Sequence, residues 1–231
     1  MMSLIPHPKT SPPTTLWFEE GRPYIQASVL TGQAISFLEQ SLPALTRSLG
    51  VLRVEHCKYS HETTKNGRFY LFDSCEPDDE ALALSPLHLR WRANERRGSI
   101  VFREDPALSA PIRLQSCKGD ALVADITLSS PWRAKALLAP PTIPTDLLTA
   151  LVTAVRKVNL LTLPETRRIR CGFIANYTVP MAEDLAKTPV PIVIEGHQAS
   201  KTEATSIALS EISYSLAGKR QSMSICFFLW A

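Results

Sequence analysis

In the stretch LHLRWRANERRGSIVFRE, Leu87–Glu104, apolar and polar side chains alternate from Leu87 to Arg92, and a second apolar segment, Ile100–Phe102, follows a polar centre. Such alternation predicts two antiparallel strands joined by a turn. Pairing Arg92 with Ser99 gives this hairpin one apolar face and one basic face. The apolar face collects Leu87, Leu89, Trp91, Ile100 and Phe102, and the opposite face collects His88, Arg90, Arg92, Val101 and Arg103.

Two further regions show a hairpin pattern. Val51–Tyr59 and Arg68–Phe72 are rich in β-branched and aromatic residues, and they flank Asn66-Gly67, a strong signal for a hairpin turn. A three-residue loop at Lys118–Asp120 would pair the segments on either side of it. Consecutive hairpins of this kind predict a largely antiparallel sheet with one buried face. The third hairpin would gather on one side Ile112, Leu114, Leu122, Ala124, Ile126 and Leu128.

Apolar residues at helical spacing predict helices over 31–49, 145–158 and 200–217. Pro43 would kink or restart the first of these helices. In the last one, Ser200 and Glu203 have the spacing of a capping box. Helices at these positions would pack on the sheet.

Strands are expected at 168–177, 190–195 and 223–230, with a short helix near Glu183. The last strand is apolar throughout, which is typical of a strand buried on both faces. Parallel pairing of 190–195 with 223–230 would create a βαβ unit. The expected fold class is therefore α+β, with a mostly antiparallel but mixed sheet built from hairpins, packed by two or three helices and closed by that βαβ unit.

The domain organisation follows from proline placement. Residues 1–15 are rich in proline and threonine and are expected to form a flexible tail. Residues 16–231 would form a single α+β domain. Pro140, Pro141 and Pro144 make 137–144 the internal candidate for a hinge.

Composition bounds the class of protein. The chain has 231 residues, 45% of them hydrophobic, and a formal net charge of +3, which is too small to imply a nucleic-acid or membrane partner by itself. No signal-peptide core and no apolar run long enough to span a membrane are visible. The 5 cysteines are an odd number and are scattered singly, which indicates reduced thiols and a cytoplasmic location.

The densest group of metal-type side chains is His56, Cys57, His61 and Cys75. Strand register would place Cys57 and His61 on one face of the first hairpin and the other two on the opposite face. The Cys-x-x-Cys spacing of structural zinc sites is also missing. We therefore expect no metal and no cofactor.

The leading functional hypothesis rests on arginines that share strand faces. Guanidinium groups two residues apart can contact successive phosphates, and arginine forms the planar, bidentate contacts that phosphates favour. The sequence thus predicts a non-enzymatic binding or assembly protein that contacts a polyanion, with RNA or DNA favoured over an anionic membrane. Ion pairs with Glu95, Glu104 and Asp105 would neutralise part of the positive charge of these arginines. The proposed contacts are His88, Arg90, Arg92, Arg96, Arg97, Arg103, Arg168 and Arg170.

Two alternatives stay open. The first is an enzyme in which Glu195 and His197 lie at a strand-to-helix loop, with an anionic substrate over the amides of a helix starting near Ser200. The second is a structural, oligomerising subunit whose tail 1–15 orders on a protein partner or on another copy of the chain.

Overall fold

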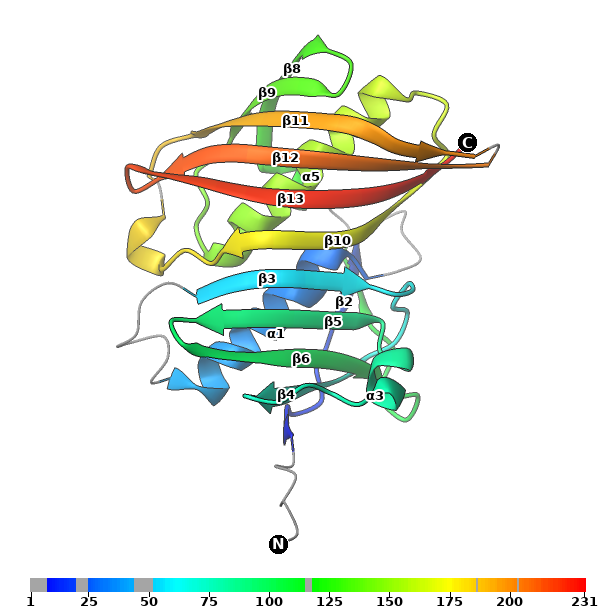
Figure 1. The fold of residues 1–231 in the computed structure, drawn as a ribbon, viewed down its shortest axis with the longest axis vertical. Helices are drawn as coiled ribbons and strands as arrows, with labels where there is room; N and C mark the ends of the chain where they lie inside the picture. Colours follow the sequence, from blue (N-terminus) through cyan, green and yellow to red (C-terminus); the bar gives the residue numbers. More distant parts are fainter. Residues whose placement is uncertain (1–7, 20–24, 44–51, 115–117, 186, 203) are drawn as a thin grey trace, which may run out of the picture.

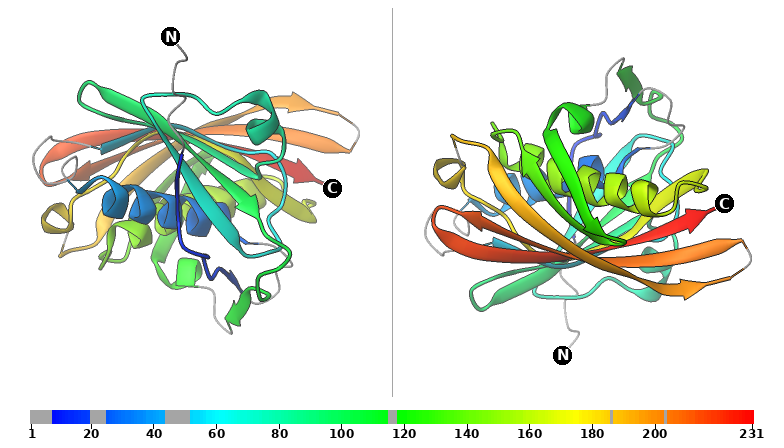
Figure 2. Two further views of the ribbon diagram at one scale, coloured as in Figure 1. Left: turned by 90° about the horizontal axis from the view of Figure 1, so that it is seen from below. Right: turned by 90° about the horizontal axis from the view of Figure 1, so that it is seen from above.

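Strands dominate the chain and pair into one 11-stranded sheet in which every neighbouring pair is antiparallel. The computed structural model describes residues 8–19, 25–43, 52–114, 118–185, 187–202 and 204–231. The sheet is strongly curved, and its long helices lie on the concave side (Figures 1 and 2). The core fills the space between the helices and this concave face.

The sheet divides into two halves that meet along β3 and β10. The first half contains, from the outer edge to the centre, β1 (Lys9–Thr10), β4 (Gly67–Asp73), β6 (Arg96–Glu104), β5 (Leu87–Ala93) and β3 (Leu52–Tyr59). The second half continues with β10 (Arg168–Thr178), β13 (Lys219–Trp230), β12 (Thr205–Leu216), β11 (Val190–Lys201), β9 (Arg133–Leu138) and β8 (Val123–Ser130).

Each half has one long helix, α1 (Ala27–Ser41) in the first and α5 (Pro144–Thr162) in the second. Proline at the first position of α5 suits a helix start, because its missing N–H would have no partner there. The apolar stripe of α5 is fully buried against the sheet. The two helices also lie side by side (Figure 2).

Shorter elements complete the chain. They are the parallel pair β2 (Trp17–Glu19) and β7 (Ile112–Leu114), the helices α3 (Asp79–Ala83) and α4 (Lys118–Ala121), and a 3-10 turn, η1 (Ala182–Asp184). None of the helices in the described part of the chain is long and apolar enough to cross a membrane.

The two halves connect their strands differently. In the second half β11, β12 and β13 follow one another as a meander, each beside the next. In the first half the chain leaves the outer strand β4, passes through α3 and enters β5 beside β3. Strand β6 then returns between β5 and β4. The halves are therefore similar in layout and distinct in connectivity.

Much of the expected architecture is confirmed. The fold is α+β with a mostly antiparallel sheet, and α5 and β10 lie where periodicity placed them. The hairpin over Leu87–Glu104 exists with the expected buried face. Its register differs by two residues, since Arg90 rather than Arg92 is opposite Ser99. A shift of two residues keeps every side chain on the same face.

The hairpin expected around Asn66-Gly67 is wrong. Both β3 and β4 are strands, but β5 and β6 lie between them. The Asn66 side chain explains the difference, because its Oδ1 accepts from Leu16 N at 2.7 Å and its Nδ2 donates to Ser109 O at 2.7 Å. Asn66 thus connects distant segments instead of forming a tight turn between its neighbours.

The third expected hairpin is also wrong. Ile112–Leu114 pairs in parallel with β2, while β8 pairs with β9. The expected loop at Lys118–Asp120 lies within α4. Both segments have strand periodicity, but their partners come from elsewhere in the chain.

The closing βαβ unit is wrong as well, because 205–216 is the strand β12 and pairs antiparallel with both β11 and β13. The apolar residues Ala208, Ile212 and Leu216 are four apart. A spacing of four places side chains on one face of a helix and equally on one face of a strand. The β-sheet neighbours therefore decided the conformation of this segment.

Lys9 and Thr10 lie within the expected tail and pair with Leu71 and Tyr70 of β4. Residues 137–144 run from the end of β9 to the start of α5. The single domain over 16–231 and the hinge at 137–144 stay predictions.

Candidate functional site

The two halves of the sheet separate at one end of the β3–β10 pair. Pairing between β3 and β10 ends at Lys58 and Phe173, whereas β10 remains paired with β13 as far as Arg168. Between the end of β3 and the start of β10 lies a cavity of about 50 Å³. We call it the inter-half pocket. It is lined by Ile25, Gln26, Ala27, Leu30, Tyr59, His61, Glu62, Thr63, Val152, Arg156, Ile169, Arg170, Cys171 and Phe227.

The start of α1 forms one wall of the pocket. Gln26 is the N-cap residue in an extended conformation, and no hydrogen bond from its side chain caps the helix. Ile25 N donates to Thr63 O at 2.8 Å, which fastens this helix start to the segment after β3. The first N–H groups of a helix lack partners within the helix and carry a positive partial charge. The pocket thus borders a group of hydrogen-bond donors.

The segment after β3 brings polar side chains to the same place. Thr63 is 1% exposed, and its Oγ1 has no hydrogen-bond partner among the described residues. His61 is exposed. The Glu62 carboxylate accepts from Arg168 at 2.6 Å, which ties this segment to β10.

Arginines from the second half complete the lining. Arg156 of α5 and Arg170 of β10 are among the lining residues, but the Arg170 side chain lies on the face of β10 opposite Cys171, over Phe228 and Trp230. The Arg170 guanidinium lies 5.3 Å from the ring centre of Phe228 and donates to Ser60 O at 3.5 Å. Its Nε is buried and has no partner within the described part of the chain. Among the described residues that line the pocket, Glu62 alone has a carboxylate.

Beneath the pocket, a buried network holds α1 against β3. The Tyr59 hydroxyl donates to Ala27 O at 3.2 Å and is hydrogen-bonded to Thr31 Oγ1, which also lies 3.4 Å from Cys57 Sγ. Burial raises the pKa of the Cys57 thiol to about 11 and raises the pKa of Cys171 well above its usual range. Both thiols are therefore protonated at neutral pH and are poor nucleophiles.

The chemistry of the lining suits an oxygen-bearing ligand. The start of α1 and Thr63 offer donors to a carbonyl or carboxylate oxygen. His61 brings to the same lining an imidazole, the side chain that most often serves as a general acid or base. Within the described ranges, no group of three His, Cys, Asp or Glu residues is placed to hold a metal ion.

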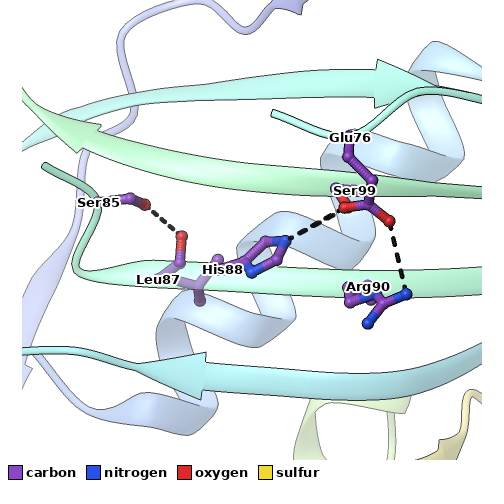
Figure 3. Close-up of polar contacts among 6 residues, drawn as sticks. All are labelled: Glu76, Ser85, Leu87, His88, Arg90 and Ser99. Carbon is purple, nitrogen blue, oxygen red and sulfur yellow. Dashed lines mark hydrogen bonds and ion pairs between the residues drawn. The ribbon is translucent and has the colours of Figure 1, made fainter. Parts of the chain in front are cut away.

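Arg90 and Arg92, two of the arginines that the sequence singled out, lie on the outer face of the sheet beside carboxylates. Figure 3 shows Glu76 bound by Ser99 Oγ at 2.8 Å and lying 3.5 Å from Arg90 Nη2. Arg92 pairs with Glu55 at 3.2 Å. The carboxylates expected from sequence proximity were Glu95, Glu104 and Asp105, whereas the observed partners are Glu76 and Glu55.

Some of the remaining predicted contacts also pair with carboxylates, and others do not. Arg96 pairs with Asp73 at 2.5 Å, and Arg168 with Glu62. Arg97 is exposed at the end of β6. Arg103 lies 5.4 Å from the ring centre of Tyr70. Only Arg170 of the predicted set borders the inter-half pocket.

Glu76, His88 and Ser99 resemble the parts of a nucleophilic triad, but their order is unsuitable. Ser99 Oγ donates to Glu76 and lies 3.3 Å from His88 Nε2, so the serine stands between the other two (Figure 3). A catalytic triad requires the histidine in the middle, activating the serine. Ser99 is also 0% exposed. The cluster therefore fixes the Glu76 segment to the sheet.

Glu195 and His197 are both exposed on β11, and Glu195 pairs with Arg133 at 3.3 Å. The helix expected near Ser200 does not form, because β11 continues to Lys201. The amides that would have held an anion there are consequently part of a strand.

No family model matches the chain, and no curated protein does. Solved structures, however, are similar over nearly the whole length. A tesB protein of Mycobacterium avium subspecies paratuberculosis is 11% identical, with a TM-score of 0.51 over 97% of this chain and 94% of that one. The dehydratase domain of RzxB from Pseudomonas fluorescens is 10% identical, with a TM-score of 0.51 over 90% and 86%.

A putative oleoyl thioesterase from Lactobacillus plantarum is 8% identical, with a TM-score of 0.50 over 97% of this chain and 96% of that chain. These proteins have the hot-dog fold, a long curved sheet wrapped around a helix. The present chain has this fold, with a helix and a curved half-sheet in each of its halves.

The nucleic-acid hypothesis is wrong. The structural neighbours are dehydratase and thioesterase proteins, which gives no support to a nucleic-acid partner. Several of the predicted arginines are, moreover, held by carboxylates of this chain. Sequence reasoning missed the inter-half pocket because its lining comes from segments more than a hundred residues apart. Only the polar run His61-Glu62-Thr63, directly after a strand, could have signalled it.

Proposed function

We propose that this protein is an enzyme that acts on an acyl thioester and binds the acyl group in the inter-half pocket. One observation carries the proposal: the start of α1 borders the same small cavity as the buried Thr63 hydroxyl, which has no partner among the described residues, and His61 also lines it. The likeness to thioesterases and to a dehydratase domain supports an acyl substrate.

Hydrolysis of the thioester would proceed by general base catalysis. His61 removes a proton from a water molecule, whose oxygen attacks the carbonyl carbon and forms the new C–O bond. The carbonyl electron pair moves onto its oxygen, where the first amides of α1 and the Thr63 hydroxyl stabilise the negative charge. The C–S bond then breaks, and the leaving thiolate takes the proton from the imidazolium. The products are a carboxylic acid and a thiol.

Thiol release from butyryl-CoA by the full chain tests this function. The His61→Ala variant should lose at least about 100-fold in kcat, because a positioned base contributes that much or more. His197→Ala is the matched control, since His197 is exposed on β11 and does not border the pocket. Equal rates for wild type and His61→Ala would refute the assignment of the base, and an absence of thiol release from acyl-CoA substrates would refute the function.

A further inference from the structure

The inter-half pocket has an apolar wall built from both long helices and from the sheet. Leu30 of α1 and Val152 of α5 line it from the helices, and Ile169 and Phe227 line it from the sheet. All four belong to the hydrophobic core, with exposed fractions from 2% to 8%. An apolar wall offers no hydrogen-bond partner, so the part of a ligand that lies against it should be hydrocarbon.

The size of the cavity limits the length of that hydrocarbon. A volume of about 50 Å³ holds roughly three to five water molecules, and a methylene group is similar in size to a water molecule. A larger cavity of about 380 Å³ lies between β8 and the last turns of α5. Within the described part of the chain, no residue lines both cavities. A long chain therefore cannot continue from the pocket into that larger space.

The spacing of residues along α1 indicates where the pocket ends. Ala27 and Leu30 both line it, and residues three apart lie on the same side of a helix. Ala27 is half-buried, whereas Leu30 is 2% exposed. Leu30 lies about 4.5 Å further along the helix axis, because each residue advances about 1.5 Å. A chain of only a few carbon atoms spans this distance.

The helices that bound the pocket are held in place. The Tyr59 hydroxyl donates to Ala27 O at 3.2 Å and is hydrogen-bonded to Thr31, which fixes the start of α1 on β3. At Gly32, α1 is packed against Thr145 of α5. Because the interior is close-packed, a longer ligand could enter only by displacing these contacts.

We propose that the substrate is the thioester of a short hydrocarbon acid with about two to four carbon atoms, and that Leu30 sets this limit. The inference rests on the proposed function, because it names the acyl group that the same site accepts. The thioester carbonyl would lie toward the start of α1 and His61. The acyl chain would end against Leu30, Val152 and Phe227.

Thiol release from acetyl-, butyryl-, hexanoyl- and octanoyl-CoA by the full chain tests the length limit. From butyryl- to octanoyl-CoA, kcat/KM should fall at least about 10-fold, because one methylene group too many in an apolar pocket already has an effect of about that size. A kcat/KM for octanoyl-CoA equal to or higher than that for butyryl-CoA would overturn the inference.

Variants locate the limit. Leu30→Ala should raise the ratio of kcat/KM for octanoyl-CoA to that for butyryl-CoA at least about 10-fold, because it removes part of the wall. Leu38→Ala is the matched control, since Leu38 belongs to the same helix and is also 2% exposed but does not line the pocket. If circular dichroism shows that Leu30→Ala is unfolded, Val152→Ala decides in its place. An unchanged ratio in the folded pocket variant, or an equal rise in Leu38→Ala, would contradict the role of this wall.

The length limit and the proposed function fail separately. S-butyl-CoA and S-octyl-CoA are thioethers that cannot be hydrolysed, and titration calorimetry measures their binding to the full chain. Tighter binding of S-butyl-CoA, without thiol release from any acyl-CoA, would support the short pocket and refute the thioester hydrolase. Thiol release with equal kcat/KM for butyryl- and octanoyl-CoA would support the hydrolase and refute the length limit. Neither binding nor thiol release would refute both.

Discussion

Gly32 of α1 and Thr145 of α5 set the distance between the two helices. A Cβ atom at Gly32 would lie 2.4 Å from Cγ2 of Thr145, which is far inside normal contact distance. The two helices thus pack tightly against each other at a position where α1 has no side chain. The neighbouring pocket depends on this spacing, since both helices contribute to its lining.

Gly32→Ala should therefore destabilise the protein by about 1–3 kcal/mol, the usual cost of overpacking. This loss is expected even though alanine favours a helix over glycine by about 1 kcal/mol. Urea denaturation followed by circular dichroism measures it. The second change Thr145→Ser removes Cγ2, so the double variant should recover most of the stability. Greater stability of Gly32→Ala alone would show that the helices are not in contact here.

Tyr59→Phe should destabilise the protein by about 1–2 kcal/mol, because it removes the hydroxyl that bonds Thr31 and Ala27 O inside the core. Tyr70→Phe serves as the comparison, since Tyr70 is half-buried on the outer face. Urea midpoints of the two variants give the difference. Equal midpoints would mean that the network below the pocket contributes no stability.

Asn66→Ala should cost about 1–3 kcal/mol, because the buried backbone Leu16 N loses its acceptor and the backbone Ser109 O loses a donor. Asn66→Asp keeps the acceptor for Leu16 N, but it buries a negative charge and places a carboxylate oxygen against Ser109 O, so its loss should be at least as large. Thermal unfolding of both variants measures the order. An Asn66→Asp protein clearly more stable than Asn66→Ala would contradict the assigned contacts.

Acid should destabilise the protein through His88 and His56. Burial lowers the pKa of both residues, against the attraction of Glu76 in the case of His88. As the pH falls below about 6.5, the unfolded chain binds protons first, and stability is lost. The double variant His56→Gln/His88→Gln should show a weaker dependence of its urea midpoint on pH between 7 and 5. An equally steep dependence would place the responsible groups elsewhere.

The periodicity of side chains within a segment was sufficient to predict two elements of the fold. The stripe of Leu147, Leu151 and Val155 has helical period, and the alternation in Leu87–Glu104 has strand period. Each was confirmed as an element with the expected buried face. The error in the hairpin register was harmless, since a shift of two residues preserves the faces.

The candidate site could not be derived in the same way. The predicted arginine set rests on shared strand faces, which the sequence does encode. Their carboxylate partners, such as Glu76 for Arg90 and Glu62 for Arg168, come from loops whose course the sequence does not specify. The sequence presents His61 only as a candidate metal ligand, whereas in the structure it lines the pocket.

The sequence by itself determined the α+β class, the helix α5 and the faces of the β5–β6 hairpin, because periodicity and burial act within a few residues of each other. Tertiary structure decided which strands pair, since a residue spacing of four left 205–216 compatible with either a helix or a strand. It also decided the inter-half pocket, where β3 and β10 separate after Lys58 and Phe173. Such an opening depends on contacts between distant segments, which the periodicity of a short segment does not predict.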